Sequence, residues 1–265
     1  MVARAADAGL RCIEWGGDVH VPPGRPDIAR RVRALTEDAG LAVASYGSYF
    51  RTGTDVDSAA QFGLVLESAR ALGAPRIRIW AGSEGSAQTS GLSDLVRMTR
   101  KALLEADRRT ADEGIDLAFE FHGGTFTDTA ESALRLIASV DQPRIGSYWQ
   151  PPNGMPDAGA LEGLRLLLPV LRGVHVFSWW PDTERLPLTA RADLWRAAIS
   201  ELTDHGQDLD LLLEFVPDDD PDVLRREAAT LRSWITEARR DREARHEPEA
   251  GARHEGGAGQ EREAR

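Results

Sequence analysis

The sequence predicts an α/β protein with the architecture of a (β/α)8 TIM barrel. Helical stretches alternate with short strand-like runs along the chain. The sequence lacks the glycine-rich dinucleotide fingerprint that would favour an open sheet over a barrel. The runs are almost continuously apolar, which is typical of parallel strands buried on both faces. The chain has 265 residues, of which 42% are hydrophobic, so it can fill a sizeable core.

Glycine marks the passage from helix to strand at five places. A glycine directly after a helix is the usual left-handed cap, and the apolar run behind it is typical of a strand. The preceding segments show helical periodicity, as in the spacing of Phe62, Val65 and Ala69. Two further strands lack the glycine. The seven segments are, in chain order, ADAGLRCIEW, EDAGLAVASY, RALGAPRIRIW, ADEGIDLAFEF, RIGSYW, GVHVFSW and TDHGQDLDLLLEF.

These segments supply one strand fewer than a closed barrel requires. The first strand lies near residues 11 to 15, behind a helix-like segment at residues 2 to 8. Either the natural start lies upstream of Met1, or the barrel has an open seam between its first and last strands. We expect the former, because a seam exposes unpaired strand edges that barrels otherwise eliminate. The expected fold is therefore a (β/α)8 barrel that lacks its first strand at the N-terminus.

The chain is expected to contain one structured domain and a tail. Residues 1–241 would form the barrel, as a catalytic domain, and residues 242–265 a disordered charged tail. The tail contains no valine, isoleucine, leucine, methionine or aromatic residue, so burial cannot offset the entropy cost of ordering it. Its histidines, His246 and His254, are interpreted as bystanders rather than ligands.

The composition narrows the partners and the compartment. There are 43 acidic and 32 basic side chains, and the net charge of −11 disfavours nucleic acids and anionic membranes as partners. The N-terminus lacks the apolar core of a signal peptide, and no apolar run approaches the roughly 20 residues of a membrane helix. We therefore expect a soluble cytoplasmic protein. The single cysteine, Cys12, excludes an internal disulfide and is expected to fill the core.

Polar side chains end four consecutive strands of the expected barrel, where such barrels build their active sites. A carboxylate in an apolar strand is costly to bury unless it is paired or binds a metal. Two carboxylates and an imidazole suit a divalent cation such as Mn²⁺, Co²⁺ or Mg²⁺. The alternative is that each acid pairs with an arginine. The four candidates are Glu120, Gln150, His175 and Glu214.

In the order of these residues the chain resembles the xylose isomerase-like TIM barrels, specifically the sugar phosphate isomerase/epimerase group. The resemblance runs from Ala3 to about Arg240. The family pattern has a Glu after one strand, Asp-x-x-His after the next, a His after the third and a Glu after the last. QPPN stands where Asp-x-x-His is usual, so Gln150 replaces the acid and Asn153 replaces the histidine. The matching positions are Glu120, His175 and Glu214.

The resemblance implies a metal-dependent isomerase or epimerase that acts on a ketose or related sugar, with or without a phosphate group. All four candidates would hold the cation. Glu120 and Glu214, on opposite sides of the substrate, would remove and return a proton through an enediolate. The Gln150 oxygen is a neutral donor that can still ligate the cation. It leaves a net charge near zero, so we expect a weaker but more electrophilic metal.

Several alternatives stay open at this point. Gln150 could merely hydrogen-bond a glutamate in a metal-free pocket. The resemblance also covers a lyase that dehydrates a keto-inositol through the same enolate. A third alternative is a non-catalytic, degenerate barrel that binds a small polyol. The sequence does not decide between epimerisation and isomerisation, and because such barrels often self-associate, a homo-oligomer is a further open expectation.

Other residues near the expected mouth are candidates for binding the sugar. Trp15 ends the first strand and would pack against a sugar face, with core filling as the alternative. His20 follows that strand, with a plain surface loop as its alternative. The loop at residues 80–86 offers backbone N–H groups to a phosphate, but a lone glycine-rich loop is weak support. Asn153 is also a candidate for binding the sugar, because it occupies the last position of QPPN, where the family pattern has histidine.

Two more candidates carry charge or can hydrogen-bond. His122 lies two residues beyond the first candidate glutamate, so on an extended chain it points the same way. Stacking on Phe126 is its alternative. Arg185 would reach a substrate oxygen or phosphate, and its alternative is a solvated loop charge beside Asp182 and Glu184.

Overall fold

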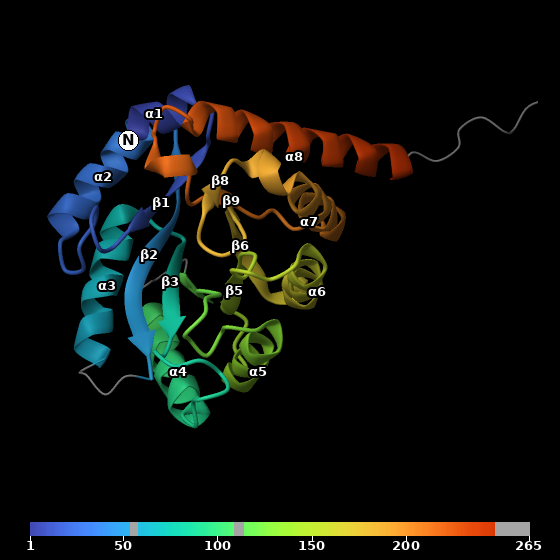
Figure 1. Cartoon of the computed structure of the whole chain (residues 1–265). Helices are drawn as coiled ribbons and strands as arrows, with labels where there is room; N and C mark the ends of the chain where they lie inside the picture. Colours follow the sequence, from blue (N-terminus) through green and yellow to red (C-terminus); the bar gives the residue numbers. More distant parts are fainter. Residues whose placement is uncertain (54–57, 109–113, 247–265) are drawn as a thin grey trace, which may run out of the picture.

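The computed structural model describes residues 1–53, 58–108 and 114–246, and it shows a barrel of parallel strands with helices around it (Figure 1). The described strands form one seven-stranded sheet in the order β1-β2-β3-β4-β5-β6-β9, and β7 (Ser178–Trp179) pairs with β8 (Arg185–Leu186) in a small hairpin. The predicted fold class is therefore confirmed. The barrel strands are β1 (Cys12–Gly16), β2 (Ala42–Thr52), β3 (Arg76–Ala81), β4 (Asp116–Phe119), β5 (Ile145–Trp149), β6 (Leu171–Val176) and β9 (Leu211–Leu213).

A helix follows each barrel strand, and a short helix precedes β1. Four of the five predicted glycine caps, Gly9, Gly40, Gly73 and Gly206, have φ between 72° and 80°, a left-handed conformation that favours glycine. The helices are α1 (Val2–Asp7), α2 (Pro26–Asp38), α3 (Ser58–Leu72), α4 (Leu92–Arg108), α5 (Ala130–Val140), α6 (Asp157–Leu167), α7 (Ala192–His205) and α8 (Leu224–His246).

Most of the apolar core lies between the strands and the helices. One cluster, with Tyr46 and Ile77, packs β1 to β5 against α2 to α5, and a second, with Trp149 and Trp195, packs β5, β6 and β9 against α5 to α8. Inside the barrel a small cluster that includes Tyr148 and Leu212 fills the space below the mouth. Because apolar packing occupies the outer layer, inward-facing positions nearer the mouth are left for polar side chains.

The seam of the barrel lies between β1 and β9, the two ends of the strand order, which are not paired with each other in the described residues. Helices α1 and α8 lie beside each other (Figure 1), and Arg4 pairs with Asp222 at 2.7 Å. Below the mouth, Cys12 Sγ lies 3.6 Å from Asp210 Oδ1 across the seam. Burial, with Asp210 nearby, raises the pKa of the Cys12 thiol to about 12, which agrees with a cysteine that is not a nucleophile.

Helix α8 passes the expected end of the structured domain. It continues through residues 242–246 to His246, so the boundary proposed at residue 241 falls inside a helix. The rest of the proposed tail, with His254, lies outside the described residues. Within the described part of the chain, none of the helices combines the length and apolar character needed to cross a membrane.

Candidate active site

The four residues predicted at the strand ends lie together at the carboxyl end of the barrel. Glu120 directly follows β4, Gln150 follows β5, His175 lies in β6, and Glu214 follows β9. His175 Nδ1 faces the other three, at 3.1 Å from Gln150 Oε1, 3.5 Å from Glu120 Oε1 and 3.6 Å from Glu214 Oε2. Glu120 and His175 are almost fully buried, whereas the Glu214 side chain is 27% exposed. Glu214 is thus the more accessible of the two glutamates.

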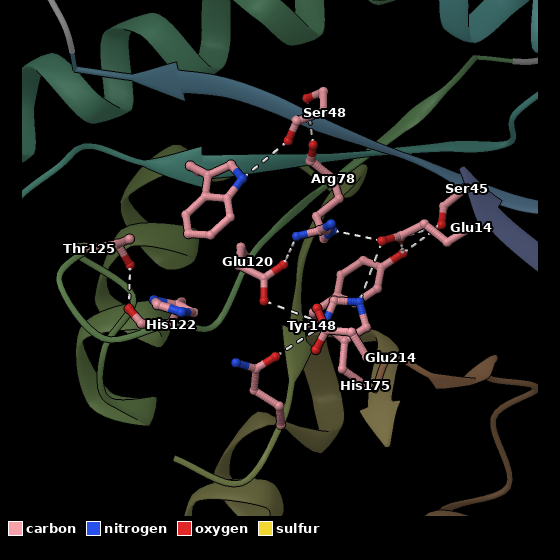
Figure 2. Close-up of polar contacts among 12 residues, drawn as sticks. Glu14, Ser45, Ser48, Arg78, Glu120, His122, Thr125, Tyr148, His175 and Glu214 are labelled. Carbon is pink, nitrogen blue, oxygen red and sulfur yellow. Dashed lines mark hydrogen bonds and ion pairs between the residues drawn. The ribbon is translucent and has the colours of Figure 1, made fainter. Parts of the chain in front are cut away.

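Glu14 on β1 is a fifth member of this cluster (Figure 2). Its Oε1 accepts a hydrogen bond from Arg78 Nε at 2.9 Å and lies 3.5 Å from His175 Nε2. Its Oε2 accepts from Ser45 Oγ at 2.5 Å and from the Tyr148 hydroxyl at 2.9 Å. Glu14 was not among the predicted site residues, although it lies in an apolar strand, as Glu120 lies at the end of one.

Arg78 on β3 is another member of the cluster that was not predicted. Figure 2 shows its guanidinium between two carboxylates, those of Glu14 and Glu120, and it pairs with both. The Arg78 side chain is only 10% exposed. The alternation in RIRIW, with an arginine two residues after another arginine, indicated inward-facing cations. The alternative to the metal site, in which each strand-end acid pairs with an arginine, is thus met for Glu120, which also faces His175.

In this cluster three glutamates face two basic side chains, Arg78 and His175. Although burial lowers it, the carboxylates of Glu214 and Glu120 raise the pKa of His175 to about 10. Burial favours the neutral form of Glu120, but Arg78 and then His175 outweigh it and hold the pKa of Glu120 below its usual range. Burial also raises the pKa of Glu214, and this effect prevails over the attraction of His175. The two glutamates therefore differ in charge environment as well as in access.

The donor set fits a divalent cation in its chemistry, although no three His, Cys, Asp or Glu side chains of the described residues already stand as a metal cage. The acids turn instead toward Arg78 and His175. Bonds of about 2.1 Å give neighbouring ligand atoms a separation of roughly 3.0 to 3.4 Å, depending on geometry. The three oxygens lie 3.1 to 3.6 Å from His175 Nδ1, close to the separation expected between atoms that bind one cation.

Gly47 on β2 leaves space for the Arg78–Glu14 pair. A Cβ atom at this position would lie 2.8 Å from Arg78 Nη2 and 2.9 Å from Glu14 Oε1. Because both groups are held by further contacts, we expect Gly47→Ala to displace the pair and to lower the free energy of unfolding by about 1–3 kcal/mol, measured by urea denaturation. Gly63→Ala is the control, since its Cβ meets nothing within 4 Å in helix α3. Equal stability of Gly47→Ala and wild type would contradict the close approach.

Trp15 does not line the site. Its ring is 4% exposed and packs in the outer core, and its Nε1 donates to Thr36 Oγ1 of α2 at 3.2 Å. Neighbouring residues of a strand face opposite sides, so an inward Glu14 requires an outward Trp15. The proposed sugar contact is therefore replaced by its packing alternative. His20 lies at the edge of this ring, with centroids 5.4 Å apart.

His122 lies beyond Glu120 as expected, but its neighbour is Trp80. The two ring centroids are 5.3 Å apart, whereas Phe126, the predicted alternative partner, lies under Arg135. Tyr49, which is 52% exposed, stacks on Trp80 with centroids 5.9 Å apart. This group of stacked rings was not predicted, because Tyr49 lies in the part of β2 that extends beyond the predicted strand.

Arg185 has a different partner from the predicted ones. It pairs with Asp219 rather than with Asp182 or Glu184, and its guanidinium lies 4.6 Å from the ring centroid of Phe215. Phe215 directly follows Glu214, so Arg185 is close to the site but already held.

Two remaining candidates lie in loops. Asn153 is exposed in the turn after β5. In the loop at residues 80–86, the Ser86 N–H donates to Asp128 Oδ2 at 3.0 Å. That amide already serves a carboxylate, so the proposed phosphate contact loses support.

A parallel barrel with buried ionisable groups at the carboxyl ends of its strands has the arrangement on which TIM-barrel active sites are built. The sequence pattern of the xylose isomerase-like TIM barrels matches residues 2–234, and the chain belongs to that family. None of the curated protein sequences is detectably similar to it.

Solved structures share this fold at low sequence identity. The probable 3-DHS dehydratase AsbF of Bacillus anthracis is 19% identical, with a TM-score of 0.68 over 87% of this chain and 92% of that chain. A xylose isomerase-like TIM barrel protein from Mycobacterium smegmatis in complex with magnesium is 17% identical, with a TM-score of 0.65 over 90% and 88%. A D-psicose 3-epimerase solved with D-fructose is 13% identical, with a TM-score of 0.59 over 90% and 91%. At these identities the likeness shows the fold alone.

Proposed function

We propose that the protein is a metal-dependent isomerase or epimerase that acts on a ketose or related sugar. The observation that carries the proposal is the convergence of three side-chain oxygens, from Glu120, Gln150 and Glu214, on His175 Nδ1 at the barrel mouth. Family membership supports it, and relatives solved with magnesium and zinc indicate the kind of cation to test.

The two glutamates would carry the proton transfers. A divalent cation held by the four donors would supply positive charge to stabilise an enediolate. Glu214, with its partly exposed side chain, is placed to meet the substrate first, and Glu120 approaches from β4. Since β5 and β6 separate β4 from β9 in the sheet, the carboxylates approach from different sides. One would remove the proton next to the carbonyl and the other would return it.

The charge of the site supports a neutral substrate. Glu14 and Arg78 form a pair of opposite charges and cancel. Two glutamates, a neutral imidazole, the Gln150 amide and a dication then sum to a net charge near zero. An aspartate at position 150 would make this sum negative. The neutral amide thus fits an electrophilic site.

A dehydratase is the second candidate, and one observation favours it. Glu120 is sealed and bound to Arg78, whereas Glu214 is accessible. Elimination of water can be carried out by one carboxylate, which removes the proton next to the carbonyl and then gives it to the departing hydroxyl, while epimerisation requires groups on both faces of the carbon. Incubation with candidate ketoses in D₂O distinguishes the two activities, because epimerisation or isomerisation incorporates deuterium and elimination yields an unsaturated carbonyl product that absorbs in the ultraviolet.

The metal site itself is tested by thermal unfolding of EDTA-treated protein titrated with Mn²⁺, Co²⁺ and Mg²⁺. We expect one ion to raise stability saturably, by about 2.7 kcal/mol at a hundred times its dissociation constant. Glu214→Ala should abolish the rise. Glu201→Ala is a matched control, because the Glu201 side chain is 23% exposed and pairs with Arg165 away from the mouth.

The outcomes separate the readings of the site. A rise that survives in Glu214→Ala would place the ion elsewhere. If no ion raised the stability, the hypothesis of a metal-dependent enzyme would be wrong. This outcome would leave a metal-free pocket in which Gln150 only hydrogen-bonds. A rise without turnover of any ketose in the D₂O assay would favour the non-catalytic, polyol-binding barrel.

A further inference from the structure

The two nitrogens of the His175 ring face different sets of partners. Nδ1 faces the three oxygens of the proposed metal site. Nε2 faces Glu14 Oε1 at 3.5 Å, from the opposite side of the ring (Figure 2). We infer that Glu14 is a positioning residue, which holds the His175 ring by Nε2 so that Nδ1 is presented to the cation. This inference rests on the proposed metal site.

Glu14 is not itself placed to be a ligand. Oε1 accepts from Arg78 Nε and contacts His175 Nε2, and Oε2 accepts from Ser45 and Tyr148. Each oxygen thus has two partners, which leaves little capacity for a cation. A carboxylate that binds the far nitrogen of a ligating histidine is a recurring arrangement in metal sites, where it sets the ring orientation and the nitrogen that carries the proton.

The position of Glu14 is fixed from several strands at once. Ser45 lies on β2, Arg78 on β3 and Tyr148 on β5, so the carboxylate is tied across the barrel interior. The Tyr148 hydroxyl also lies 3.0 Å from Ser45 Oγ and accepts from Arg76 at 3.4 Å. The Glu14 carboxylate that faces His175 is therefore more constrained than a carboxylate held by a single ion pair.

The His175 ring itself has little freedom to turn. It is 2% exposed, and its centroid lies 4.8 Å from that of the Tyr148 ring. Tyr148 thus both packs on the imidazole and donates to Glu14. Ser45 and Tyr148 hold the carboxylate of Glu14, and Glu14 in turn holds His175 Nε2. Nδ1 therefore remains free to bind the metal.

The test is the affinity for Co²⁺, measured by titration of the visible absorption of EDTA-treated protein. Glu14→Gln keeps the size of the side chain but removes the charge that holds Nε2. We expect it to weaken Co²⁺ binding by about 10- to 100-fold, the usual effect of losing such a partner, with an unchanged spectrum at saturation. Glu227→Gln is the control, because that carboxylate is also buried and serves Leu188 and Arg226 instead. It should bind Co²⁺ as wild type does.

A second measurement needs no metal. In ¹H–¹⁵N spectra of the metal-free protein, assigned with His175→Gln, the His175 Nε2–H should be protected from exchange in wild type and lose that protection in Glu14→Gln. Equal Co²⁺ affinity in both proteins, or equal protection of this proton, would overturn the role of Glu14. Failure of the wild type to bind Co²⁺ would overturn the proposed metal site. The proton comparison would then decide alone whether Glu14 orients His175.

Discussion

Replacement of Arg78 by methionine should destabilise the metal-free protein by about 3–5 kcal/mol, because it leaves buried carboxylates without their cation. The side chains of Glu14 and Glu120 are 12% and 2% exposed, so water cannot replace the guanidinium. Against the effect of burial, Arg78 holds the pKa of both acids below the usual range. Lowered acid pKa values contribute stability above the unfolded pKa and lose it as the pH falls. The loss should therefore be largest near neutral pH, measured by urea unfolding.

Two further variants separate charge from packing. Arg191→Met removes an equally buried arginine, but its partner Asp157 is 44% exposed and can be solvated, so we expect a smaller loss. Addition of Glu14→Gln to Arg78→Met should restore part of the stability, because one of the two orphaned charges is gone. If Arg78→Met cost less than Arg191→Met, the buried ion pairs would not be what stabilises the barrel interior.

The barrel was predictable because its strands and helices repeat one local pattern. Glycine caps and apolar runs depend on neighbouring residues alone, and the structure keeps them at Gly40, Gly73 and elsewhere. The extension of β2 from Gly47 to Thr52 was not predicted. There Gly47 and Arg51 interrupt the apolar run, because the inward face of this strand meets a polar interior. Pairing of Arg51 with Trp80 on β3 maintains the strand, and such pairing is not visible in a local window.

The site was predictable where a polar residue ends an apolar strand, as at Glu120, His175 and Glu214. Arg78 and the role of Glu14 were missed for a different reason. The two residues are 64 positions apart and lie on strands that are not neighbours, so their contact depends on how the barrel curves. Inward alternation in RIRIW and CIEW indicates that both face the interior, but not that they meet. The same alternation places the side chain of Trp15, the neighbour of Glu14, on the outer face of the barrel.

The stability of the metal-free protein should fall as the pH rises from about 6.5 toward 10, through the loss of one proton from His175. Burial works against the charged ring, but the neighbouring carboxylates raise its pKa from 6.5 to about 10. They face it from both sides, Glu14 at Nε2 and Glu120 and Glu214 at Nδ1, while the Tyr148 ring packs on its face. A group whose pKa is raised on folding contributes stability that is complete below the unfolded pKa and lost through the folded one.

The slope of this loss is set by one proton, at most about 1.4 kcal/mol per pH unit. Urea unfolding in EDTA at a series of pH values measures it, with His175→Gln as the reference, since glutamine does not titrate and groups away from the cluster contribute equally to both proteins. The two proteins should converge as the pH approaches 10, with the wild type losing its advantage. A constant difference across this range would mean that the imidazole is neutral in the folded protein. Arg78 would then be the only cation balancing Glu14, Glu120 and Glu214 among the described residues of the cluster.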